Sequence, residues 1–228
     1  MSADPARTGR TGLPLMTLPG VYAPQHDTRL LMAALNREGI GSGTEVLDVG
    51  TGSGALALHA ALLGARVTAV DVARRAVATA RLNALLHRRR ITVQRGDLLS
   101  AVPERSYDLV VCNPPYVPSP LDRLPGHGAA RAWDAGRDGR AVLDRVCEAA
   151  PAALRPGGRL LLVHSGLCDG EATVRRLSDA GLRARVSDRA LVPLGPVLRS
   201  RLRWLRDAGL MGAADTAEEL VVIRAERL

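Results

Sequence analysis

Short apolar runs of strand length alternate with longer segments of helical periodicity through most of the chain, and this alternation limits the fold more than any other feature. "EVLDV" at 45–49 and "YDLVVC" at 107–112 are typical of the runs, and "ARRAVATARLNALL" at 73–86 is typical of the segments between them. Strands separated by helices of about ten to fifteen residues indicate βαβ units with right-handed crossovers. The sequence therefore predicts an α/β fold with a doubly wound, mostly parallel sheet.

The expected elements begin near residue 23 and continue almost to the C-terminus. Strands are expected at 45–49, 66–70, 91–94, 107–112, 158–165, 182–191 and 218–225. Helices are expected at 23–37, 53–63, 73–86, 138–154 and 169–180. Residues 196–209 indicate at most a partial helix, so the chain should finish as an antiparallel, hairpin-like pair. Residues 1–20 are expected to be a flexible tail, and residues 21–228 a single domain with one α/β core.

Composition argues against several classes of protein. The formal net charge is +8, and every cationic side chain apart from histidine is arginine, which a coding bias explains more simply than nucleic-acid binding. Three distant cysteines and five scattered histidines have no metal-ligand or disulfide spacing, so no metal site is expected. The first twenty residues have no apolar core of the signal-peptide type, and no apolar run is long enough to span a membrane, so we expect no signal peptide and a cytoplasmic protein.

A glycine-rich loop follows the first expected strand, in "DVGTGSGA" at 48–55. Gly50 and Gly52 allow a tight turn and a close approach of ligand to backbone at a helix N-terminus. Asp71 follows about twenty residues later at the end of the next strand, where a carboxylate can accept both ribose hydroxyls. The loop also satisfies G-x-G-x-x-A, so the pattern leaves a nicotinamide cofactor open.

Two further acids favour S-adenosylmethionine over a dinucleotide. Asp48 would repel a pyrophosphate but can bind the ammonium of an amino acid. Asp97, in "GDLL" after the third strand, can accept a hydrogen bond from the adenine amino group. Because the carboxyl ends of parallel strands meet at one edge of a sheet, these acids should converge on one crevice.

The fourth expected strand ends in "NPPY", residues 113–116. Prolines cannot extend a sheet, because they lack the N–H and fix φ. The strand should therefore stop at Asn113, with the amide held where the strand opens onto a loop at the same crevice.

With these motifs the chain resembles the HemK family of class I S-adenosylmethionine-dependent methyltransferases, which methylate the glutamine of peptide chain release factors. The resemblance is greatest to the short archaeal and eukaryotic branch of that family. It rests on 19–31, 46–58, 69–72, 96–99, 113–117, 127–140 and 136–145. It implies a Rossmann-like seven-stranded sheet of order 3-2-1-4-5-7-6 with the last strand antiparallel.

The resemblance also implies roles for individual residues. The expected cofactor contacts are Thr28, Asp48, Gly50, Asp71, Asp97, Leu98 and Asn113, beside Gly52 from the glycine loop. The expected substrate site is Asn113, Pro114, Pro115 and Tyr116, of which Asn113, Pro114 and Tyr116 are the expected catalytic residues. The Asn113 side-chain oxygen and the Pro114 carbonyl would each accept one N–H of a planar amide, and Tyr116 would stack on its plane.

The NPPY motif indicates an acceptor with a planar nitrogen but does not identify the acceptor molecule. NPPY also occurs in methyltransferases that act on exocyclic amines of nucleic-acid bases, and a small-molecule acceptor is the further alternative. The bacterial branch carries an additional N-terminal helical domain that we do not expect here. In the short branch a small zinc-binding activator protein docks at the edge strand, which would be 91–94 in this chain. Arginines on both sides of that strand favour instead an edge guarded against pairing.

Overall fold

A seven-stranded sheet forms the centre of the computed structural model, which describes residues 14–103, 105–121, 123–126 and 128–228. The strand order is β3-β2-β1-β4-β5-β7-β6, with β7 antiparallel to both of its neighbours, so the expected topology is confirmed. The strands are β1 (Glu45–Val49), β2 (Arg66–Asp71), β3 (Ile91–Arg95), β4 (Tyr107–Cys112), β5 (Leu154–Ser165), β6 (Leu182–Pro193) and β7 (Ala217–Arg227).

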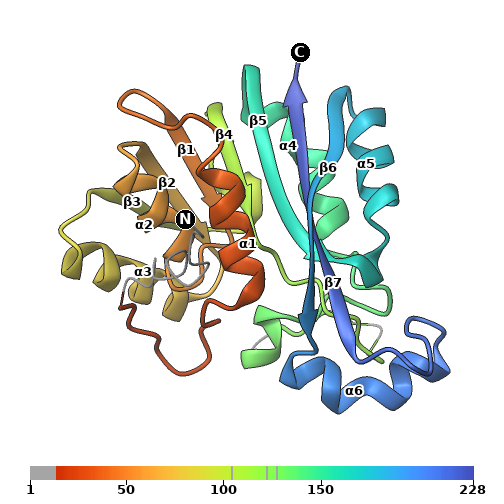
Figure 1. The fold of residues 1–228 in the computed structure, drawn as a ribbon. Helices are drawn as coiled ribbons and strands as arrows, with labels where there is room; N and C mark the ends of the chain where they lie inside the picture. The colour runs from red at the N-terminus through yellow and green to blue at the C-terminus, as the bar shows by residue number, and fades with distance from the viewer. Residues whose placement is uncertain (1–13, 104, 122, 127) are drawn as a thin grey trace, which may run out of the picture.

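Helices cover both faces of this sheet (Figure 1). One face carries α1 (His26–Leu35), α2 (Ala55–Leu62) and α3 (Arg74–Leu86), and the other carries α4 (Leu143–Ala153) and α5 (Gly170–Asp179). A sixth helix, α6 (Pro196–Asp207), lies across the end of the sheet where β6 stops. Short 3-10 turns occur at η2 (Leu98–Ala101), η3 (Ala129–Ala132) and η4 (Gly166–Cys168).

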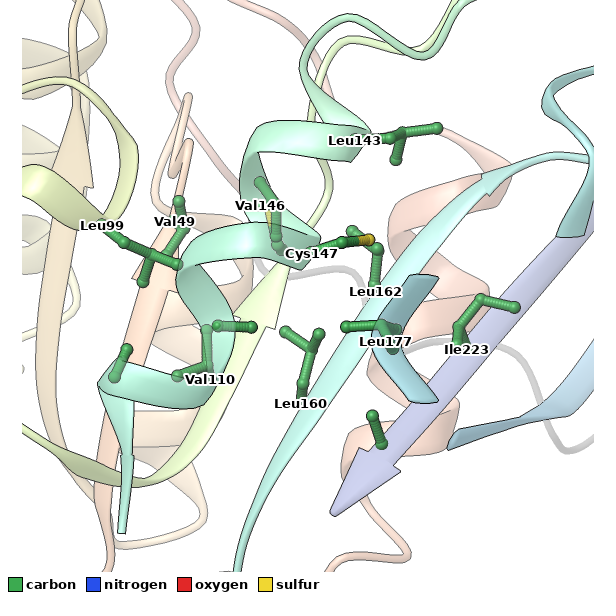
Figure 2. Packing of buried hydrophobic residues seen from close by; sticks show 14 of the residues in the cluster. Val49, Leu99, Val110, Leu143, Val146, Cys147, Leu160, Leu162, Leu177 and Ile223 are labelled. Atoms are coloured by element: carbon green, nitrogen blue, oxygen red, sulfur yellow. The ribbon is translucent and has the colours of Figure 1, made fainter. Parts of the chain in front are cut away.

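Branched aliphatic side chains fill the space between the sheet and these helices. Figure 2 shows Val146 and Cys147 of α4 packed over Val110 of β4 and Leu160 and Leu162 of β5. All five side chains are completely buried. A core built from small residues without any phenylalanine lets the helices approach the sheet closely, which fixes the strand ends that carry the polar motifs.

The structure corrects two of the expected helices. Residues 196–207 form a full helix, because Leu198 and Leu205 share one buried face that packs with Leu194 and Met211. Helix α4 begins at Leu143 and not at residue 138, because Gly139 has a φ of +73°, which a right-handed helix cannot contain. The residues on either side of Gly139 therefore form a turn beside the NPPY loop.

The expected N-terminal tail, 1–20, falls largely outside the described residues. Its described part, 14–20, runs along α3: Asn83 donates to the Met16 carbonyl and accepts from the Met16 N–H at 2.8 and 2.9 Å. His87 contacts the Pro14 carbonyl at 3.0 Å. Among the described residues, no helix combines the length and apolar character needed to cross a bilayer.

Candidate active site at the carboxyl edge of the sheet

A cavity of about 620 Å³ opens at the carboxyl ends of β1, β2, β3 and β4. Its wall contains every site residue expected from the sequence except Asp48. Those residues are Thr28, Gly50, Gly52, Asp71, Asp97, Leu98, Asn113, Pro114, Pro115 and Tyr116. The motifs that the sequence placed on separate strand ends therefore face one common space.

The glycine loop forms the floor of this cavity. Gly50, Gly52 and Gly54 have φ values of +72°, +54° and +84°, a conformation that L side chains rarely adopt. The N–H groups of Gly50 and Thr51 both donate to the Val70 carbonyl, which ties the loop to β2. The loop can therefore bring bare backbone against a ligand, as the sequence predicted.

Asp71 lies beside this loop with both carboxylate oxygens in use. The Gly52 N–H donates to Oδ2 at 2.9 Å, and the Ala73 N–H donates to Oδ1 at 2.8 Å. Burial raises the pKa of this carboxyl, while those two N–H groups and the charge of Arg131 oppose the rise. Each oxygen keeps a further lone pair, so the pair can still accept from adjacent ribose hydroxyls.

Asp48 lies beneath the loop and does not line the cavity. Its Oδ2 accepts from the Thr51 hydroxyl at 2.6 Å and from the Ala57 N–H at 3.0 Å. Its Oδ1 is buried without a partner, and burial raises the pKa of the carboxyl to about 7. Asp48 therefore supports the loop from behind in this geometry, and its expected contact with a ligand ammonium stays a prediction.

Asp97 and Leu98 close the cavity at the end of β3. Arg145 of α4 reaches Asp97 Oδ2 at 2.6 Å, and both side chains are about half exposed. Leu98 has a φ of +50°, an uncommon conformation for a residue that is not glycine. Such backbone strain is typical of functional sites, and here it turns an apolar side chain toward the cavity.

The NPPY loop forms the opposite wall and is held from behind. The Cys168 thiol donates to the Tyr116 carbonyl at 3.0 Å. Gly139 packs against the same carbonyl, and a Cβ at this position would overlap the carbonyl oxygen and lie 2.7 Å from the Cys168 sulfur. Only glycine at residue 139 leaves room for the observed path of the loop.

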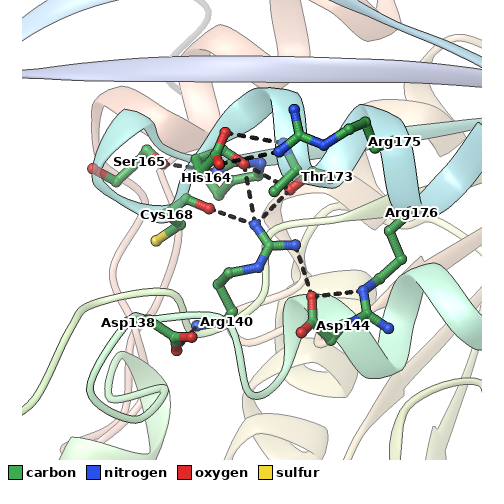
Figure 3. Close-up of polar contacts among 11 residues, drawn as sticks. Asp138, Arg140, Asp144, His164, Ser165, Cys168, Thr173, Arg175 and Arg176 are labelled. Carbon is green, nitrogen blue, oxygen red and sulfur yellow. Dashed lines mark hydrogen bonds and ion pairs between the residues drawn. The ribbon is translucent and has the colours of Figure 1, made fainter.

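A hydrogen-bond network centred on Arg140 holds in place Cys168, which supports the NPPY loop (Figure 3). The Arg140 guanidinium donates to the carbonyls of Cys168 and Asp169, to the Thr173 hydroxyl at 3.1 Å and to Asp144 at 2.7 Å. The "GRDGR" motif thus connects the turn before α4 to η4 and α5 on the far side of Tyr116.

Asp27 and Tyr22 are site residues to which the sequence analysis gave no role. The Tyr22 and Tyr116 hydroxyls donate to Asp27 Oδ2 at 2.7 and 3.0 Å. Thr28 Oγ1 donates to Asp27 Oδ1 at 3.1 Å, and Asn113 Nδ2 lies 3.4 Å from Thr28 Oγ1. Both residues belong to the segment 19–31 that carried the family resemblance, which was the only available signal.

Comparison with known proteins gives consistent results. The methyltransferase small domain family matches residues 12–121. A putative protein N5-glutamine methyltransferase of Methanocaldococcus jannaschii is 32% identical over 80% of this chain and 91% of its own length. Methyltransferase HEMK2 of Homo sapiens is 36% identical over 72% of this chain and 80% of its own length. The release factor glutamine methyltransferase of Geobacter sulfurreducens is 34% identical over 75% of this chain, which spans only 62% of that enzyme.

Solved structures show the same fold. The chain resembles a chain of the E. cuniculi Mtq2–Trm112 complex, described as responsible for methylation of the eRF1 translation termination factor. The TM-score is 0.64 at 26% identity, and the match covers 92% of this chain and 99% of the other. A T. thermophilus 16S rRNA methyltransferase in complex with AdoMet and guanosine has a TM-score of 0.59 over 93% of this chain and 46% of its own, and its 24% identity indicates shared fold alone.

Proposed function

Because the chain belongs to the HemK-type family of class I methyltransferases, we propose that it transfers a methyl group from S-adenosylmethionine to the side-chain amide nitrogen of a glutamine in a peptide chain release factor. The proposed compartment is the cytoplasm, where release factors act. One observation carries the proposal: Asn113 and Pro114 share a cavity wall with Tyr116, opposite the carboxylates of Asp71 and Asp97. One cavity therefore offers separate partners for an adenosyl cofactor and for a planar amide.

The residues of the cavity fit the cofactor. Asp71 would accept the two ribose hydroxyls, and the free oxygen of Asp97 would accept from the adenine amino group beside the apolar Leu98. Gly50 and Gly52 add no side chain to the floor of the cavity, where the methionine part would lie. When bound, S-adenosylmethionine supplies a sulfonium methyl group that is already activated for displacement, so no general base is assigned to the transfer.

Asn113 and Pro114 would position the methyl acceptor. A glutamine amide nitrogen is a poor nucleophile, because its lone pair is delocalised into the carbonyl. The Asn113 side-chain oxygen and the Pro114 carbonyl would each accept one N–H of the planar amide and so aim its nitrogen, while Tyr116 would stack on the plane. The ring constraint of Pro114 and Pro115 and the packing of Gly139 against the Tyr116 carbonyl support a rigid loop.

An exocyclic base amine would fit the same pair of acceptors, so a nucleic-acid substrate is the alternative. A direct test uses purified protein with methyl-labelled S-adenosylmethionine and, in parallel, a release factor, the same release factor with its target glutamine replaced by asparagine, tRNA, rRNA and DNA. The proposal expects label in the unmodified release factor alone. Label in a nucleic acid with none in the release factor would assign the alternative function.

We further propose that a small zinc-binding activator protein docks at the free edge of β3. This strand pairs only with β2 among the described strands. The Gly96 N–H donates to the Asp71 carbonyl, and alternation along the strand then turns the backbone groups of Val93 outward. Leu85 and Leu86 of α3, next to this edge, are 74% and 56% exposed, which offers apolar surface to a partner.

Arg81 already donates to the outward Val93 carbonyl at 2.8 Å, as expected of a guarded edge. The test is co-purification from the native host of wild type, Val93→Pro and Thr92→Ala, the last being a control that leaves the backbone unchanged. A small protein should accompany wild type and Thr92→Ala but not Val93→Pro. The activator is ruled out if wild type purifies alone and is fully active on its substrate.

A further inference from the structure

Asp27 is the most heavily used acceptor near the NPPY loop. Its side chain is 3% exposed in the first turn of α1. The Tyr22 and Tyr116 hydroxyls donate to Oδ2, and the Thr28 N–H and hydroxyl donate to Oδ1. Burial and the charge of Asp27 raise the pKa values of both tyrosines, so their hydroxyls remain donors. Four donors therefore converge on one buried carboxylate.

This arrangement sets a direction for the hydrogen bonds that lead to Asn113. A carboxylate has no hydrogen to donate, so the single hydroxyl hydrogen of Thr28 must point at Asp27. Thr28 Oγ1 can then only accept from its other neighbour. That neighbour is Asn113, 3.4 Å away, which must present its NH₂ group to Thr28 and its carbonyl oxygen to the opposite side.

We propose that Asp27 is a positioning residue which, through Thr28, holds the Asn113 amide with its oxygen toward the methyl acceptor. The inference deepens the proposed function and rests on it for the identity of the acceptor. Without Asp27, the Thr28 hydroxyl is free to donate to the Asn113 oxygen, and the amide can turn its NH₂ group into the cavity. Two donors would then face each other, and the acceptor amide could not be held.

The same carboxylate also anchors the stacking residue. Tyr116 donates to Asp27 Oδ2 at 3.0 Å, so one side chain holds two members of the NPPY loop. The contact between Thr28 and Asn113 is longer than an ordinary N–H···O bond of about 2.9–3.0 Å and can shorten when an acceptor is seated. Asp27 thereby selects acceptors that carry N–H groups, which are planar amides and amines.

Kinetics of matched variants test the relay. Thr28→Val keeps the shape of the side chain and removes its hydroxyl, and Asp27→Asn replaces an oxygen by a donor. Each should lower kcat for the glutamine acceptor about 10- to 100-fold, a larger factor than any rise in the KM for the cofactor, which Thr28 is also expected to contact. Thr79→Val is the matched control: within the described part of the chain its buried hydroxyl donates to the Arg75 carbonyl on α3 alone, and kcat should stay at the wild-type value.

A second readout does not depend on any acceptor. The side-chain amide resonances of Asn113 in the full-length protein are identified by their loss in Asn113→Ala. In wild type and Thr79→Val, one amide proton should be protected from exchange by Thr28, and the protection should be lost in Thr28→Val. If wild type methylates no glutamine but this pattern is seen, the proposed function fails and the relay stands. If Thr28→Val leaves the Asn113 resonances unchanged, the relay is wrong, whatever the activity of the variant.

Discussion

The two walls of the cavity are built in different ways. On the cofactor wall, the ends of β1 and β2 are shaped by backbone: three left-handed glycines, with Asp71 bonded to nearby N–H groups. On the acceptor wall, the NPPY loop after β4 is held by side chains from distant parts of the chain, Asp27 in front and Cys168 behind. Tyr116 and Asp27 are 89 residues apart.

This difference has a functional consequence. A wall made of local backbone turns keeps its shape wherever the sequence motif is intact. A wall held by distant side chains can be displaced by a single substitution far from the loop itself. We therefore expect substitutions to separate the two properties of the site, with cofactor affinity set by one wall and transfer rate set by the other.

The largest separation should come from Gly139→Ala. The new methyl group would overlap the Tyr116 carbonyl and lie 2.7 Å from the Cys168 sulfur at a φ of +73°, so the loop must move. Transfer should fall by at least about 100-fold and stability by on the order of 1–3 kcal/mol, while cofactor affinity stays within about threefold.

Gly136→Ala is the matched control for this change. Gly136 has a φ of +83°, but its added Cβ would meet only the Ala141 methyl group, at 3.6 Å. This variant should show the backbone strain without the loss of transfer. Equal losses in both variants, measured by single-turnover kinetics and calorimetry, would show that strain and not the support of Tyr116 is responsible.

Asp71→Ala should change the other wall. It removes the proposed acceptor of the ribose hydroxyls and frees the N–H groups of Gly52 and Ala73. We expect a loss of on the order of 1.5–3 kcal/mol in cofactor binding, with the transfer rate at saturating cofactor little changed. Calorimetric titration checks this, and an unchanged affinity would reject the ribose assignment.

Each wall also conceals one buried acid with an unpartnered oxygen, Asp48 under the glycine loop and Glu218 near Asp27. Burial raises the pKa of each to about 7, from 3.8 and 4.5. Because the folded state then holds the proton more tightly than the unfolded state, the stabilisation is fully present below about pH 4 and is lost as the pH rises through 7.

Asp48→Asn and Glu218→Gln should each remove part of this pH dependence. When the pH rises from 5 to 8, wild type should lose on the order of 2 kcal/mol more unfolding free energy than either variant. Denaturant unfolding of the three proteins at both pH values measures this difference. Parallel pH profiles for wild type and both variants would mean that neither acid titrates in this range.

Arg145→Ala should have the smallest effect. Its ion pair with Asp97 is about half exposed, and such pairs contribute about 0.2–1 kcal/mol. Thermal unfolding should change only slightly, and cofactor affinity should stay within about threefold, because the second oxygen of Asp97 remains available. A large loss of affinity would assign Arg145 itself a direct role in binding.

The sequence specified the cofactor wall better than the acceptor wall. The strand order was implied by the family resemblance, whereas the glycine loop and the strand-end position of Asp71 followed from short, local patterns. The place of Asp48 beneath the loop could not be predicted, because sequence spacing does not tell whether a strand-end side chain faces the cavity or lies under the loop. Asp27 received no role because its contact with Tyr116, 89 residues away, cannot be recognised from the sequence. Helix α6 was predicted as at most a partial helix, because its many arginines make the apolar spacing of Leu198 and Leu205 hard to recognise in the sequence.

The central claim, that Asn113 serves transfer and not the fold, is tested most directly by single-turnover methylation with Asn113→Ala at saturating cofactor. The account predicts a folded protein with cofactor affinity within about tenfold of wild type and a transfer rate lowered at least about 100-fold, because the acceptor amide loses its partner. A variant that is folded, binds the cofactor and transfers the methyl group at the wild-type rate would contradict the account.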